Sequence, residues 1–160
     1  MPIPSPYRSL PPERRISLLL HALTTSREAR ALYTARLIAR GGGFRAVTLN
    51  SWPADKLARE IVRMKAEQQQ DELDLLHLLY VELEPAIQIT FLDATGVAHE
   101  KGVMPEELQP PFAGEGAVGR AAAAVMEQHG EDGARYLHTL ARYSAAGWPG
   151  IMDLAAKLDT

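Results

Sequence analysis

Apolar side chains recur every three or four positions along most of the chain, which is the spacing of one face of an α-helix. The clearest case follows Pro12, where Ile16, Leu19, Leu20 and Leu23 fall on one face. Proline suits the first position of a helix, because the amide proton that it lacks would have no partner there. The pattern therefore predicts a helix of about a dozen residues that begins at Pro12.

Turn-forming residues divide the remaining apolar pattern into further helices. A second helix is expected from Arg27 to about Ala39, with Ala31, Ala35 and Ile38 near one stripe, because three glycines follow it and favour its end. A long helix is expected after Ser51-Trp52-Pro53, where a capping residue precedes a proline. The remaining helices are expected over residues 85–95, 117–128, 133–145 and 150–158.

The segment Leu73 to Leu83 is apolar nearly all round, which is typical of a buried central helix. It either continues the helix that begins after Pro53 or starts a new one at Asp71. The sequence thus predicts an all-α fold in which six or seven helices pack around this segment. Residues 12–160 would form a single domain, residues 1–11 a proline-rich N-terminal arm, and residues 97–115 one long loop.

The stretch from Pro85 to Thr95 allows two interpretations. Ile87, Ile89 and Phe91 alternate as they would in a strand, so a hairpin over residues 86–101 in an α+β fold is the alternative. A helix is favoured, because proline is placed at its start and Gly96 at its end, where a left-handed cap is common.

The composition excludes several classes of protein. The chain has 160 residues and no cysteine, which excludes thiolate nucleophiles, disulfides, cysteine-ligated zinc and iron–sulfur clusters. Its longest apolar run, Ala121 to Met126, is too short to span a bilayer, so no membrane partner is expected and the protein is predicted to be cytoplasmic. Arginine outnumbers lysine 13 to 4 and alanine is the commonest residue, which suggests a bacterial source.

Charge is distributed unevenly along the chain. Residues 1–65 hold 12 basic and four acidic side chains, whereas residues 66–160 hold five basic and 16 acidic ones. The net charges of +8 and −11 are hidden within a total of −3. Such asymmetry indicates either a basic surface for an anionic partner or two halves that attract each other, within the fold or across a dimer.

Two kinds of binding surface follow from this pattern. We expect a non-enzymatic protein that acts in regulation or interaction through protein contacts or self-association, with Trp52 and Trp148 exposed for recognition. The alternative is a nucleic-acid-binding accessory protein, whose basic residues would neutralise phosphates. Its candidate anion-binding side chains are Arg36, Arg40, Arg45, Arg59 and Arg63.

Chemistry-bearing motifs are weak. Asp74 and His77 lie three apart on a predicted helix and could share a metal ion, but the di-iron pattern needs a second such pair, which is missing. A small enzyme centred on His77 or His99 is therefore the second alternative. The glycines from Gly114 to Gly119 match a dinucleotide fingerprint without the strand that must precede it. No catalytic residue and no cofactor are predicted.

Overall fold

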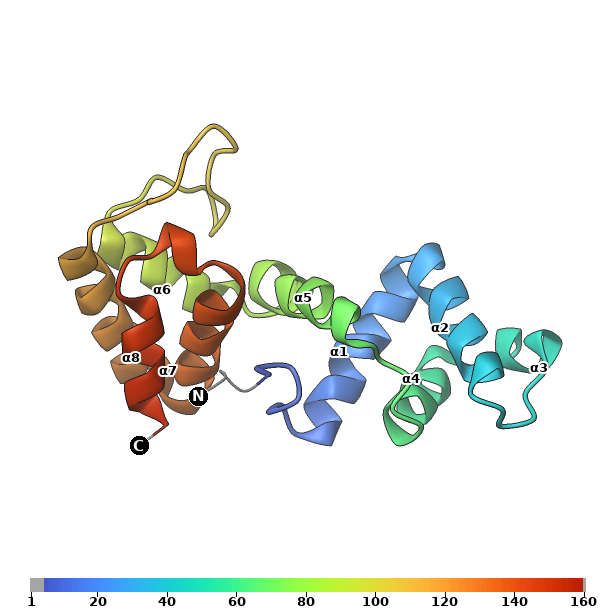
Figure 1. Cartoon of the computed structure of the whole chain (residues 1–160). Coiled ribbons are helices and arrows are strands. Elements are labelled where there is room, and N and C mark those ends of the chain that lie inside the picture. Colours follow the sequence, from blue (N-terminus) through green and yellow to red (C-terminus); the bar gives the residue numbers. More distant parts are fainter. Residues whose placement is uncertain (1–4, 160) are drawn as a thin grey trace. The chain divides into compact units, whose positions relative to one another are not determined.

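The computed structural model describes residues 5–159, and every regular element in that range is a helix (Figure 1). The all-α prediction is confirmed. Within residues 5–159 the sole β feature is an isolated bridge between Glu100 and Val103. The α-helices are α1 (Pro12–Thr25), α2 (Arg27–Ala39), α3 (Ala46–Asn50), α4 (Ala54–Arg63), α5 (Gln69–Leu78), α6 (Pro85–Thr95), α7 (Glu115–Tyr143) and α8 (Ile151–Leu158), with a π-helix η1 (Leu79–Leu83) and a 3-10 helix η2 (Ala145–Gly147).

These helices fall into two compact units. Unit 2 is the continuous segment Leu10–Leu78 and holds α1 to α5. Unit 1 joins the N-terminal segment that ends at Ser9 to the chain from Leu79 onward, and it holds η1, α6, α7, η2 and α8. Each unit has its own apolar core, and the prediction of a single domain over residues 12–160 stays a prediction.

In unit 2, α1 packs against α2, α4 and α5. Leu19 and Leu23 of the predicted apolar face are buried, Ile16 and Leu20 are half-buried, and Leu18, which lies outside that face, is buried as well. Ser26 separates α1 from α2: its extended backbone ends the first helix, and its hydroxyl accepts the Ala29 amide proton at 3.1 Å to cap the second.

The buried face of α2 differs from the predicted stripe. Ala31, Ala35 and Ile38 are exposed, while Tyr33 and Leu37 are buried. Tyrosine and leucine remove more apolar area from water than alanine does, so the helix turns these two residues toward the core.

The polar stretch after Arg63 ends one helix and starts another. Lys65 adopts a positive φ of 52°, which ends α4, and α5 begins at Gln69. The hypothesis of a separate helix near Asp71 is therefore confirmed. The prediction that Leu73 to Leu83 is a buried central helix is wrong, because these two end residues are 46% and 40% exposed and the boundary between the units falls after Leu78.

Unit 1 has an aromatic core between α6, α7 and η2. Phe91 meets Trp148 edge to face at a centroid distance of 4.9 Å, and Tyr136 meets Phe91 at 5.7 Å and Tyr80 at 5.0 Å. Trp148 is 2% exposed, so the prediction that it is exposed for recognition is wrong. An indole this large buries more apolar area inside the cluster than at the surface.

The N-terminal segment contributes to the same unit. Tyr7 is fully buried, and the Ser9 hydroxyl accepts a hydrogen bond from Arg135 Nε at 3.0 Å. Residues 5–9 thus form packed turns in place of an extended arm, while residues 1–4 of the predicted arm lie outside the described residues.

The two interpretations of Pro85 to Thr95 are resolved in favour of a helix. This segment is α6, and Gly96 caps it with a φ of 77°. The helices predicted at 117–128 and 133–145 form one element, α7, bent at Gly130 (φ 54°, ψ −127°).

Within residues 5–159 no single helix has the length and apolar character to cross a membrane. The bent pair Gln69–Leu83 and Pro85–Thr95 meets that test by length and composition.

Candidate functional site

A half-open groove lies in unit 2 between α1, α2 and α5. Its volume is about 310 Å³. Apolar side chains from all three helices form most of its wall, and polar groups lie mainly at the end of α1, at the start of α2 and in the first half of α5. We call this site the α2–α5 groove; its lining residues are Ala22, Thr25, Ser26, Glu28, Ala29, Leu32, Tyr33, Asp71, Asp74, Leu75 and Leu78.

Tyr33 contributes an aromatic ring to the wall of the groove, and only 3% of its surface is exposed. Burial raises the pKa of its phenol to about 12; Arg36 opposes the shift, while Glu67 and Asp74 add to it. The Arg36 guanidinium lies 5.4 Å from the centre of the Tyr33 ring. The phenol therefore stays neutral at physiological pH and does not serve as a base there.

A buried ion pair fixes the two main walls against each other. Arg36 of α2 pairs with the Asp71 carboxylate of α5, and their side chains are 11% and 9% exposed. The same carboxylate oxygen accepts the Gln68 amide proton at 2.8 Å, which caps the first turn of α5. The Asp71 carboxylate thus caps the start of α5 and also links this helix to α2.

The rim of the groove carries an apolar residue and two carboxylates. Leu32 is 44% exposed. Glu28 and Asp74 are exposed, and neither has a basic partner within the part of the chain that the structure describes. The groove is therefore apolar within and negative at its edge.

The five arginines predicted to bind anions are not gathered into one free basic surface. Arg36 pairs with Asp71, Arg63 pairs with Glu60, and Arg40 donates to the Lys65 carbonyl. Arg59 lies 3.7 Å from Glu13, with both side chains largely exposed. Arg45 is exposed and has no partner among the described residues.

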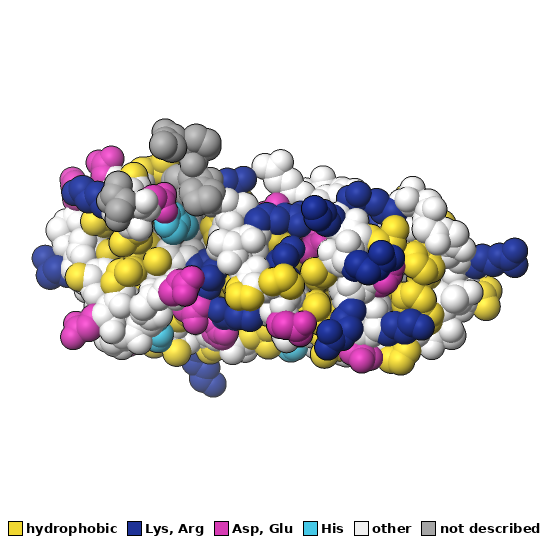
Figure 2. Space-filling view, turned by 90° about the horizontal axis from the view of Figure 1, so that it is seen from below, with side chains coloured by type: hydrophobic (Ala, Val, Ile, Leu, Met, Phe, Trp, Pro, Cys, Tyr) yellow, Lys and Arg dark blue, Asp and Glu magenta, His cyan; other side chains and the backbone are white. Residues whose placement is uncertain are grey.

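The charge distribution of the units is milder than that of the two sequence halves. Unit 2 holds eleven basic and eight acidic side chains, and unit 1 holds six and twelve. The difference arises because four acids that follow residue 65 belong to unit 2 and Arg8 belongs to unit 1. Glu67 and Asp71 face arginines of unit 2. Figure 2 shows apolar and acidic side chains between the Lys and Arg side chains of this unit, on the right of the view.

Trp52 lies in a small cluster near α3 rather than on an open surface. Its half-buried ring meets Phe44 edge to face at 5.4 Å, and the Lys56 ammonium lies 4.3 Å from its centre. Arg30, which is not among the predicted site residues, donates to the Trp52 carbonyl at 2.6 Å and to the Leu49 carbonyl at 3.4 Å. No pattern in the sequence pointed to this role, because its acceptors lie about twenty residues away.

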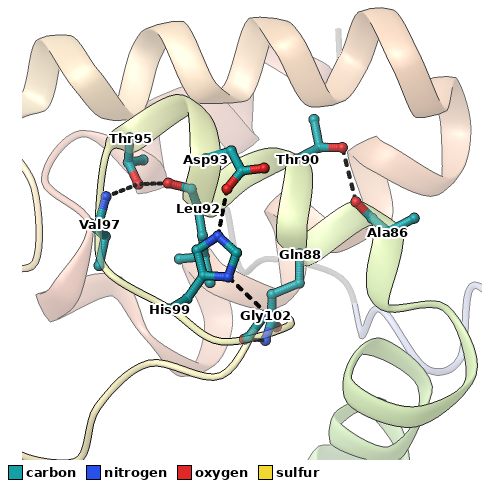
Figure 3. Close-up of polar contacts among 9 residues, drawn as sticks. All are labelled: Ala86, Gln88, Thr90, Leu92, Asp93, Thr95, Val97, His99 and Gly102. Carbon is teal, nitrogen blue, oxygen red and sulfur yellow. Dashed lines mark hydrogen bonds and ion pairs between the residues drawn. The ribbon is translucent and has the colours of Figure 1, made fainter.

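His99 is held by both of its ring nitrogens (Figure 3). Nε2 lies 2.6 Å from Asp93 Oδ1, and Nδ1 accepts the Gly102 amide proton at 3.0 Å. Gln88 also donates to the Gly102 carbonyl, so the turn after α6 is fastened to that helix. A general base or metal ligand needs a free ring nitrogen, and His99 offers none in this arrangement.

The proposed metal pair and the glycine motif receive no further support. Asp74 and His77 are exposed on α5, and no group of three or more histidine and carboxylate side chains able to hold a metal occurs in the described range. Gly114 caps α7, and its carbonyl accepts the Val118 amide proton at 3.0 Å. This is an ordinary helix start.

Comparisons of the chain with models of protein families, with curated proteins and with solved structures find no match. Its function is therefore inferred from the geometry of the site.

Proposed function

We propose that the chain is a non-enzymatic protein-binding module of an interaction or regulatory protein, and that the α2–α5 groove is its binding site. The observation that carries the proposal is an apolar groove that opens to solvent beside the exposed Leu32, with carboxylates at its edge. An apolar centre surrounded by polar groups is typical of surfaces that bind other proteins.

The residues around the groove support binding more than catalysis. Asp71 is held by Arg36 and by the Gln68 amide, and the Tyr33 phenol stays protonated at neutral pH. Catalysis by a general base or a nucleophile requires an activated group near a reacting atom. Neither of these side chains meets that requirement. The expectation of a cytoplasmic bacterial protein belongs to the same proposal and stays a prediction.

Site-specific crosslinking tests this function. A photoreactive amino acid at Leu32 should capture a partner protein, whereas the same group at Val47 should not. Val47 is the matched control, because it is an 83% exposed apolar residue of the same unit that does not line the groove.

The captured protein must then bind the purified chain. We expect Leu32→Glu to weaken that binding by about tenfold or more, because the substitution places a charge where apolar surface is buried, while Val47→Glu leaves it unchanged. Equal capture at both positions, or capture at neither, would reject the groove as a protein-binding site.

A further inference from the structure

The rim of the α2–α5 groove selects for one sign of charge. Unit 2 carries more basic than acidic side chains, yet neither Glu28 nor Asp74 forms an ion pair with a basic side chain among the described residues. Asp71, the third carboxylate of the lining, is already neutralised by Arg36. The two unpaired carboxylates thus remain available to a cationic group that approaches from solvent.

The same charges disfavour an anionic occupant. A nucleic-acid phosphate bound in this groove would lie beside two exposed carboxylates, and these like charges would repel each other. A ligand with a cationic group beside an apolar surface complements both the carboxylates at the rim and the apolar wall of the groove.

The walls of the groove favour a helix as the body of the occupant. They come from α1, α2 and α5, and the apolar contacts available are Ala22, Ala29, Leu32, Leu75 and Leu78. Side chains three and four apart on a helix can enter the space between neighbouring helices as ridges enter grooves. A volume of about 310 Å³ holds a few such side chains and lies at the lower end of the range for small-molecule pockets.

Resting on the proposed function, we infer that the α2–α5 groove binds an amphipathic helix of a partner protein, and that lysine or arginine residues flank the apolar stripe of that helix. The apolar stripe packs against Leu32, Leu75 and Leu78, and the flanking cations face Glu28 and Asp74. Apolar contacts supply most of the affinity, and the rim charges select the partner.

Two designed peptides test this inference by fluorescence anisotropy. Both are helical, of equal length and with the same leucine stripe, and they differ in carrying either lysine or glutamate beside the stripe. We expect the lysine peptide to bind the full chain about tenfold more tightly at low salt, with a smaller preference at high salt.

Charge reversal at the rim should reverse that preference. The double variant Glu28→Lys/Asp74→Lys should bind the glutamate peptide more tightly than the lysine peptide, and Glu28→Gln/Asp74→Asn should lose most of the preference. The matched control is Glu127→Lys/Glu131→Lys, which makes the same change of charge on exposed positions of α7 and should leave the preference intact. Circular dichroism of each variant checks that its helices form.

The outcomes separate the inference from the proposed function. Equal binding of both peptides, or a preference that the control variant changes as much as the rim variant does, would overturn the inference while a partner captured at Leu32 still supports the function. Failure of both peptides together with no capture at Leu32 would reject both. If the captured partner is a second copy of this chain, and the chain dimerises through Leu32 in sedimentation, the inference of a separate partner is wrong.

Discussion

Arg36 and Asp71 form the pair whose disruption should affect unit 2 most at the level of single residues. Both side chains are nearly buried, and the carboxylate also caps α5. Removing one partner leaves the other charge buried without compensation, which costs more than the intact pair contributes.

We therefore predict that Arg36→Met lowers the free energy of unfolding by about 3 kcal/mol, measured by urea denaturation. Adding Asp71→Asn should recover much of the loss, because asparagine still accepts the Gln68 amide proton without a charge. Arg45→Met is the control and should change stability little, since Arg45 is exposed and has no partner among the described residues. Equal effects of Arg36→Met and Arg45→Met would show that the pair does not hold α5.

Tyr33 should make the fold sensitive to alkali. Burial raises the pKa of its phenol from 10.0 to about 12, so the unfolded chain loses this proton at a lower pH than the folded chain does. The contribution of the protonated Tyr33 phenol to the free energy of unfolding is complete below pH 10, and it is lost as the pH rises toward 12. A pKa difference of this size between the folded and unfolded chain corresponds to about 3 kcal/mol.

Urea midpoints measured across that pH interval should fall for the wild type and fall less for Tyr33→Phe, with absorbance at high pH reporting phenol ionisation. Tyr143→Phe, at a half-exposed ring, is the comparison and should leave the fall unchanged. The same slope for Tyr33→Phe as for the wild type would show that this phenol ionises freely in the folded chain.

The roles of single residues in the groove could not be predicted from the sequence. Arg36 and Arg45 look alike in the pattern of charges, and what distinguishes them is a carboxylate 35 positions away in the case of Arg36. The sequence places Trp148 at the surface, yet its ring joins an aromatic cluster drawn from distant segments. Such partners are set by tertiary packing, which local spacing does not encode.

At the scale of elements, α7 depends on close packing after its bend. A β-carbon added at Gly133 would lie 2.6 Å from the Val125 carbonyl oxygen, a backbone atom that cannot move aside without shifting the helix. The residue at this position must therefore lack a side chain. Gly119 of the same element has open space around the equivalent point.

We predict that Gly133→Ala destabilises the protein by about 2 kcal/mol through steric overlap, whereas Gly119→Ala stabilises it by about 1 kcal/mol through helix propensity. Thermal or urea unfolding of the two variants provides the measurement. Stabilisation by both substitutions would mean that α7 can straighten at no cost.

Several helix ends were predictable, because local chemistry determines them. The glycines after Arg40, Pro85 and Gly96 mark ends that the structure confirms. The composition of Leu73 to Leu83 could not predict which of its residues are buried, because the segment crosses from one unit to the other. The five-residue α3 is not predicted by the apolar pattern, since a helix of this length depends on contacts such as those of Arg30.

For the whole molecule, the charge balance argues against strong binding of nucleic acid. Unit 2 has an excess of three positive charges, and four of the five candidate arginines already contact acidic or carbonyl groups of the protein. Electrostatic affinity for phosphates grows with the number of contacts that free cations can make.

We expect that the chain does not shift the mobility of DNA or RNA in gel experiments at physiological salt. At low salt, any weak shift should be insensitive to Arg36→Met, whose guanidinium is committed to Asp71. A strong, salt-sensitive shift that Arg45→Glu/Arg59→Glu removes would instead favour a nucleic-acid-binding protein.

The packing of the N-terminal segment has a consequence for the order of events during synthesis. Every residue of unit 2 has been translated once Leu78 is added, whereas Tyr7 and Ser9 belong to a unit whose other members begin at Leu79. Domains generally fold as their residues emerge from the ribosome. Tyr7 and Ser9 are translated before unit 2, and they must therefore wait for α7, and with it Arg135, before they reach their final environment.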